Sequence, residues 1–241
     1  MNVLMIGNSF SEDASRYLHA IAKSDGVDLN TCNLYIGGCP LSLHYQNMQT
    51  GKAAYELQVN GQKTDFFVGI EEMLRFRKWD VISLQQVSQD AISFRTYEPY
   101  LTSLAAFVRK LCPSARLFIH QTWAYEDGSA RLTQELGYGR REEMLQDVVR
   151  AYHSAKETVH ADALVPSGEL FDLLLRSGIQ KVHRDTFHAS FGLGRYALAL
   201  LWYAVLTGND VEKNDFCCFD EPVSEQEIAI VKQCVKAITE R

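Results

Sequence analysis

Residues 2–14 read NVLMIGNSFSEDA, a short apolar run that stops abruptly at a polar segment led by glycine. The apolar run shows no alternation of polar and apolar residues, which is typical of a strand buried on both faces of a parallel sheet. Gly7, Asn8 and Ser9 follow at its carboxyl end, where open α/β sheets bind their ligands. Ser9 also begins a Ser-x-x-Glu pattern with Glu12, so a plain helix cap is the alternative interpretation.

The same pattern extends along the rest of the chain. Similar apolar runs predict parallel strands at 2–6, 30–36, 80–84, 116–120 and 163–165. Helix-like stretches lie at 11–23, 68–77, 97–111, 140–159, 168–176, 191–206 and 224–239. Residues 55–68 break the alternation and predict a β-hairpin around Asn60-Gly61. We therefore expect one domain over residues 1–241, an α/β three-layer sandwich with a flavodoxin-like five-stranded parallel sheet and a small β-hairpin insertion.

Composition and charge exclude several classes of protein. The net charge of −6 argues against a nucleic-acid partner, because such proteins usually carry a basic patch. The longest apolar stretch, 196–206, has the length of a buried helix rather than of a membrane span. Met1 adjoins the first predicted strand and leaves no room for a signal peptide, so we expect a cytoplasmic protein. The six cysteines show no zinc-like spacing, and we expect free thiols, no metal and no cofactor.

Polar or glycine-rich segments follow the other predicted strands as well. The carboxyl ends of parallel strands share one edge of a sheet, so these groups should converge there. The residues expected at this edge are Gly37, Gly38, Gln85, Gln86, Gln121, Trp123 and Tyr125, together with Asp185 and His188 from a late loop. Such convergence indicates a binding or catalytic site more strongly than any single motif does.

These residues carry a resemblance to a known family. The segment IGNSFS (6–11) resembles the first block of the SGNH (GDSL-type) hydrolases, with Asn8 in place of the usual acid. Gly38 resembles the glycine of the second block, and DTFH (185–188) matches the Asp-x-x-His of the last. The third block departs from the family because its usual asparagine is missing. Here Gln85-Gln86 is similar to the Gln-Gly-Glu of the sialate and xylan acetylesterases, and the whole chain resembles an SGNH-like bacterial family.

The resemblance implies a catalytic triad and an oxyanion hole. Ser9 would be the nucleophile, His188 its base, and Asp185 the group that orients the imidazole. The backbone N–H groups of Ser9 and Gly38 and one glutamine amide would stabilise the oxyanion. We favour Gln86 over Gln85 for the third donor, and alignment by length makes Gln89 the next candidate. Further substrate contacts would come from Asn8, Trp123 and Tyr125.

The implied activity is that of a serine ester hydrolase. It would remove a small acyl group, with acetyl the first choice, from a carbohydrate or a similar small-molecule ester. Two other functions remain open at this point. An acyltransferase would use the same triad with a sugar hydroxyl as acceptor. A non-catalytic flavodoxin-like domain would bind a phosphate at the loop after the first strand, but it would give Asp185 and His188 no role.

Overall fold

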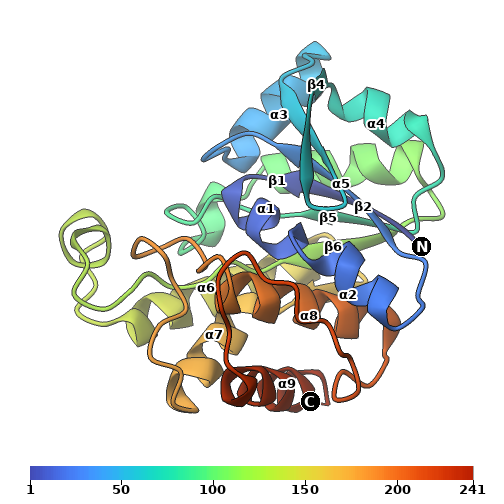
Figure 1. Cartoon of the computed structure of the whole chain (residues 1–241). Helices are drawn as coiled ribbons and strands as arrows, with labels where there is room; N and C mark the ends of the chain where they lie inside the picture. Colours follow the sequence, from blue (N-terminus) through green and yellow to red (C-terminus); the bar gives the residue numbers. More distant parts are fainter. Residues whose placement is uncertain (241) are drawn as a thin grey trace.

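A seven-stranded sheet with helices on both faces forms the centre of the molecule (Figure 1). The computed structural model describes residues 1–240. The strand order is β4-β3-β2-β1-β5-β6-β7. Five strands pair in parallel: β1 (Asn2–Gly7), β2 (Asn30–Tyr35), β5 (Val81–Leu84), β6 (Arg116–His120) and β7 (Ala163–Val165). The predicted three-layer architecture and its five parallel strands are confirmed.

The hairpin is part of the main sheet. Its strands β3 (Tyr55–Val59) and β4 (Gln62–Val68) are antiparallel, and β3 pairs with the outer edge of β2. The sheet is therefore mixed and wider than the five strands expected from the sequence, because the hairpin covers an edge of β2 that would otherwise expose unpaired backbone groups. Asn60 and Gly61 have φ values of 51° and 76°, as the predicted type I′ turn requires.

Nine α-helices flank the sheet within residues 1–240. They are α1 (Ser9–Ser15), α2 (Leu18–Ser24), α3 (Leu41–Thr50), α4 (Ile70–Phe76), α5 (Tyr100–Leu111), α6 (Arg141–Thr158), α7 (Ser167–Arg176), α8 (Leu193–Thr207) and α9 (Glu225–Thr239). Helices α1 and α2 pack against α8, which in turn packs against α9, whereas α3 and α4 pack against α5. None of these helices is both long and apolar enough to cross a membrane.

Two helices differ from the sequence-based prediction. The single helix expected over 11–23 is interrupted between α1 and α2, where the side chains of Arg16 and Tyr17 bind Asp220 and a backbone carbonyl. Helix α3 was not predicted at all. Its buried face includes the polar residues His44 and Asn47, so the apolar periodicity that marks an amphipathic helix is broken.

Candidate active site

Ser9 is the first residue of α1, directly beyond the end of β1. The residue before it, Asn8, caps the helix: its side-chain oxygen accepts the N–H of Phe10 at 3.1 Å. The helix-cap alternative for Ser9 is thus excluded, and the Ser9 hydroxyl binds elsewhere. The turn also needs glycine at position 7, because a Cβ there would lie 2.5 Å from the Oγ of Ser11.

The structure brings Ser9, His188 and Asp185 together in one hydrogen-bonded chain. The Oγ of Ser9 lies 2.8 Å from Nε2 of His188, and Nδ1 of His188 lies 2.8 Å from Oδ2 of Asp185. An ionised Asp185 only accepts hydrogen bonds, so Nδ1 carries a proton and Nε2 is free to accept the Ser9 hydroxyl proton. This arrangement can move a proton from a serine to an imidazole.

The loop between Asp185 and His188 is held in an uncommon conformation. Thr186 has a φ of 83°, which is costly for a β-branched residue. Its carbonyl accepts the N–H of Glu126 at 2.7 Å, which stabilises the turn. Both the acid and the imidazole can therefore project from one short loop toward Ser9. Backbone strain of this kind is common at functional sites.

The electrostatics of Asp185 suit an orienting carboxylate. Its partial burial tends to raise the pKa, but hydrogen bonds from the ring and the backbone N–H of His188 outweigh this, and the pKa of Asp185 is lowered overall. Its side chain is 46% exposed, compared with 18% for His188. Asp185 is therefore ionised at neutral pH while it still reaches solvent.

A buried carboxylate, Asp13, fixes this loop against α1. Its side chain is fully buried and accepts hydrogen bonds from Nη1 of Arg184 at 2.8 and 2.9 Å and from Nε of Arg195 at 2.8 Å. It also accepts the N–H of Ala189 at 3.1 Å. Because Asp13 lies one turn beyond Ser9, these bonds set the position of His188 relative to the nucleophile. The sequence alone does not reveal this anchor, since its two arginines lie 171 and 182 residues further along the chain.

A cavity of about 380 Å³ opens beside Ser9. Residues on its wall include Ser9, Gly37, Gly38, Ser88, Gln89, Arg131, Phe187 and His188. Gly38 has a φ of 61°, and within residues 1–240 neither its N–H nor that of Ser9 donates a hydrogen bond. Two of the predicted oxyanion donors are therefore free to act at this cavity.

Gln86 does not extend its amide into the cavity. Its Nε2 donates to the carbonyl of Thr96 at 3.0 Å, and its Oε1 accepts the N–H groups of Leu41 and Val87, both at 2.9 Å. The side chain is buried and joins the start of α3 to the segment after β5. Our expectation that Gln86 supplies the third donor does not agree with this geometry, because its amide is already used by loop backbone.

Gln85 is also turned away from the cavity and belongs to a buried polar chain. Its Nε2 donates to Oδ1 of Asn8 at 2.7 Å, and its Oε1 lies 2.9 Å from Nδ1 of His120. Nε2 of His120 lies 3.1 Å from the hydroxyl of Ser167 on α7. Burial lowers the pKa of His120 to about 3, so the ring is neutral and donates through Nδ1 only.

This series of buried hydrogen bonds ends at the glycine turn beside the cavity. Nδ2 of Asn8 donates to the carbonyl of Cys39 at 3.1 Å, immediately after Gly38. Asn8 lies on the cavity wall, but it is 1% exposed and its side chain binds the backbone of Phe10 and Cys39, so it positions backbone rather than offering free polar atoms to a substrate. Gln89 is the one glutamine of the three that lies on the cavity wall, and its side chain is exposed there.

Trp123 and Tyr125 lie beneath the site rather than on its surface. They are 0% and 1% exposed, and neither lines the cavity. Nε1 of Trp123 donates to the carbonyl of Phe187 at 2.7 Å, and its ring stacks on Phe10 with centroids 4.1 Å apart. The hydroxyl of Tyr125 lies 2.8 Å from that of Ser88. The Tyr125 ring also packs edge-on against Phe187, with centroids 5.7 Å apart. The two predicted substrate contacts therefore support the loop that carries His188.

The chain belongs to the family described as "Domain of unknown function (DUF4886)", whose model matches residues 2–237. It is similar to the crystal structure of a DUF4886 family protein from Bacteroides uniformis ATCC 8492, with 30% identity and a TM-score of 0.92. That match covers 99% of this chain and 94% of the other. No curated protein matches the chain.

More distant solved structures share the fold. A putative GDSL-like lipase from Parabacteroides merdae ATCC 43184 is 14% identical with a TM-score of 0.59, over 86% of this chain and 95% of the other. An acetyl xylan esterase from Geobacillus stearothermophilus is 15% identical with a TM-score of 0.52, over 82% of this chain and 90% of the other. The resemblance to the SGNH/GDSL hydrolases is thereby confirmed at the level of the fold.

Proposed function

We propose that this DUF4886 protein is a serine ester hydrolase of the SGNH type. The observation that carries the proposal is the chain Ser9–His188–Asp185, in which both hydrogen bonds measure 2.8 Å. A serine hydroxyl needs a base within hydrogen-bond reach, and the base needs an orienting partner. A phosphate-binding domain of flavodoxin type would have no use for this arrangement.

The reaction follows from these positions. His188 removes the Ser9 proton as Oγ attacks the ester carbonyl, and Asp185 stabilises the imidazolium. The N–H groups of Ser9 and Gly38 donate to the tetrahedral oxyanion, and we assign the third donor to the Gln89 side chain. The ester C–O bond then breaks, His188 protonates the departing alcohol, and a water molecule releases the acyl group from Ser9 by the same steps.

We propose a small acyl group, acetyl first, on a carbohydrate or similar small alcohol. The cavity of about 380 Å³ lies near the small end of ordinary ligand pockets, which favours a compact substrate. An acetyl xylan esterase is among the proteins that share the fold, which makes acetylated sugars the first substrates to test. An acyltransferase differs from a hydrolase only in the acceptor of the acyl group. The products of acetyl-ester turnover in the presence of added sugars therefore distinguish the two: free acetate for a hydrolase and an acetylated sugar for an acyltransferase.

The test is labelling with a fluorophosphonate probe followed by peptide mapping. We expect the label on Ser9 of the wild-type protein and none on the Ser9→Ala variant. Ser88→Ala is the matched control, since Ser88 lines the same cavity and should not affect labelling. Label on another serine, or retention of label by Ser9→Ala, would refute the assignment of the nucleophile.

A further inference from the structure

An arginine faces the proposed active site from an excursion that follows β6. Arg131 begins a single turn of π-helix, Arg131–Glu135, and lines the cavity beside Ser9. Its guanidinium carbon lies 4.0 Å from the centroid of the Phe187 ring. The Phe187 ring in turn lies 3.9 Å from the ring of His188, centroid to centroid. The Phe187 ring therefore contacts both the positively charged guanidinium of Arg131 and the proposed base.

The two arginines of this cavity differ in their partners. Arg184 forms an ion pair with the buried Asp13, which it shares with Arg195, and it also donates to the carbonyl of Ala189. Arg131 forms no ion pair with any acidic side chain of residues 1–240, and this includes Glu135 at the end of its own turn. Arg131 is thus a cation of the cavity that has no ion-pair partner among the described residues.

One acidic residue, Glu12, also lies on the cavity wall, and it has partners of its own. Glu12 accepts a hydrogen bond from Nε2 of Gln58 at 2.9 Å, and its Oε1 lies 3.7 Å from Nζ of Lys63. Nζ of Lys63 also lies 3.6 Å from Oε1 of Glu56, so two carboxylates share it. The cavity wall nevertheless carries two arginines, Arg131 and Arg184, and one acid. The guanidinium of Arg131 lies on the Phe187 ring and also interacts with the Tyr125 hydroxyl. Its planar fork has further donors, and such a fork matches a carboxylate or a phosphate.

We propose that Arg131 binds an anionic group of the substrate, a carboxylate or a phosphate carried by the ester that Ser9 attacks. This inference rests on the proposed function and narrows its substrate class. Neutral acetyl esters would be accepted, but esters with a negative charge close to the scissile bond would be preferred. The Phe187 ring sets the position of the guanidinium and places the anion on the same side of the cavity as His188.

The test compares two matched substrates. Mono-4-nitrophenyl succinate carries a carboxylate, and its methyl ester is neutral but otherwise alike. We expect Arg131→Gln to lower the ratio of kcat/KM for the anionic over the neutral ester by about tenfold or more, the value of a charge-assisted hydrogen bond. Arg131→Lys should restore part of the ratio. Arg140→Gln, an exposed arginine of the same excursion outside the cavity, should leave the ratio as in the wild type.

A second pair of substrates separates the two kinds of anion. Acetylated glycerol phosphate and acetylated glycerol differ only in the phosphate. A loss for Arg131→Gln on this pair alone identifies a site for a phosphate on the alcohol side of the ester, and a loss on the succinate pair alone identifies a site for a carboxylate on the acyl side. Equal losses on charged and neutral esters in both pairs, or none at all, would overturn the inference.

Ligand binding to the Ser9→Ala variant tests the anion site without any turnover of substrate. We expect monomethyl succinate or glycerol phosphate to bind more tightly than dimethyl succinate or glycerol in an NMR titration, and this difference should disappear when Arg131→Gln is added. Such a result would support the anion site even if the labelling experiment refuted Ser9 as the nucleophile. No preference for either charged ligand would contradict the anion site whatever the labelling shows.

Discussion

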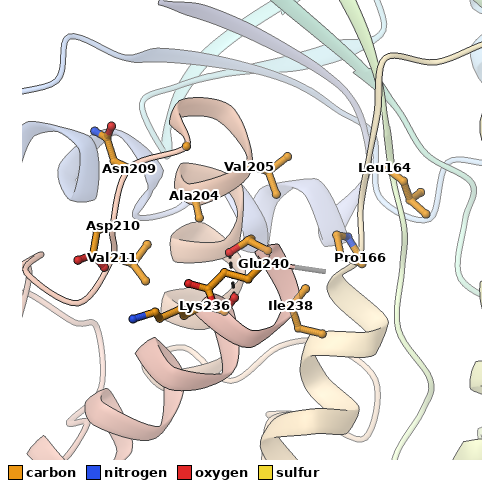
Figure 2. A pocket seen from close by; sticks show the side chains of 12 residues that line it. Leu164, Pro166, Ala204, Val205, Asn209, Asp210, Val211, Lys236, Ile238 and Glu240 are labelled. Atoms are coloured by element: carbon orange, nitrogen blue, oxygen red, sulfur yellow. Dashed lines mark hydrogen bonds between the residues drawn. The ribbon is translucent and has the colours of Figure 1, made fainter.

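Two cavities of this molecule contrast in size and in chemistry. The larger, about 720 Å³, lies where α8 and α9 end, and Figure 2 shows Val205, Lys236 and Ile238 on its wall. The described residues on this wall include no histidine, cysteine or serine, and Nζ of Lys236 is bound by Glu212 at 2.8 Å. The cavity beside Ser9 has about half that volume, but it holds a serine and a base in contact.

The difference follows from what surrounds each cavity. Beside Ser9, the segments that leave β1, β2 and β5 meet the loop that carries His188, so each contributes a different polar group. At the larger cavity, the walls come from β7 and the residue after it, from the ends of α8 and α9, and from the segment after α8. Polar side chains on this wall bind neighbouring protein groups, as Asn209 does when it donates to the Tyr203 hydroxyl at 2.9 Å. Volume alone therefore does not identify a site, whereas convergent groups at the carboxyl ends of strands do.

The largest expected effect separates the two cavities directly. His188→Ala removes the proposed base, and kcat for 4-nitrophenyl acetate should fall by about 10⁴-fold or more. Lys236→Ala, in the larger cavity, should leave the rate close to that of the wild type. Steady-state kinetics of both purified variants check this. A strong loss in Lys236→Ala with a normal His188→Ala would move the site to the other cavity.

The next effect concerns the third oxyanion donor. Gln89→Ala should lower kcat by about 100-fold with little change in KM, because the donated hydrogen bond forms mainly with the oxyanion. Gln86→Ala is the matched control, since its amide binds loop backbone, and it should chiefly lower stability. If Gln86→Ala lost kcat selectively while Gln89→Ala did not, the assignment of the donor would be reversed.

A smaller effect is expected from the buried hydrogen bonds of Gln85, which lies beneath the site. Gln85→Ala leaves the Nδ1–H of His120 without an acceptor and removes a donor from Asn8. The free energy of unfolding should fall by about 2 kcal/mol, the usual cost of an unsatisfied buried polar group. Urea denaturation measures this change. An unaltered midpoint for Gln85→Ala would show that the buried chain contributes little to stability.

The smallest effect concerns acid stability. Burial lowers the pKa of His120 to about 3, whereas an unfolded histidine titrates near 6.5. Between these values the unfolded chain binds a proton that the folded protein does not. The free energy of unfolding should therefore fall as the pH drops below about 6.5, by about 1.4 kcal/mol per pH unit for this histidine.

Urea denaturation at pH 7 and pH 5 tests this slope. His120→Gln should reduce the loss of unfolding free energy between pH 7 and pH 5 by the contribution of one titrating histidine. His153→Gln, at an exposed position, should leave this loss unchanged. The free energy of unfolding of His120→Gln should still depend on pH, because burial lowers the pKa of His44 to about 3 and that of His183 to about 4. An unchanged slope in His120→Gln would mean that this histidine does not stay neutral in the folded protein.

Local sequence patterns were enough to predict the architecture and to identify the residues nearest the proposed chemistry. Apolar runs without alternation can be buried only between two layers of helices, so they determined the five parallel strands. Asn60-Gly61 determined the hairpin turn, because few residues adopt positive φ at both positions. Asp185 and His188 are three residues apart, so one loop delivers both to Ser9.

Only the tertiary structure decided the role of the remaining polar residues. Gln85, Gln86 and Trp123 follow strands as Ser9 does, but side chains and backbone packed from distant segments bind their polar atoms. Asp13 is an anchor only because Arg184 and Arg195 return to it from the other end of the chain. Whether a polar side chain faces the cavity or the protein interior depends on partners brought together by folding, and a one-dimensional pattern does not contain them.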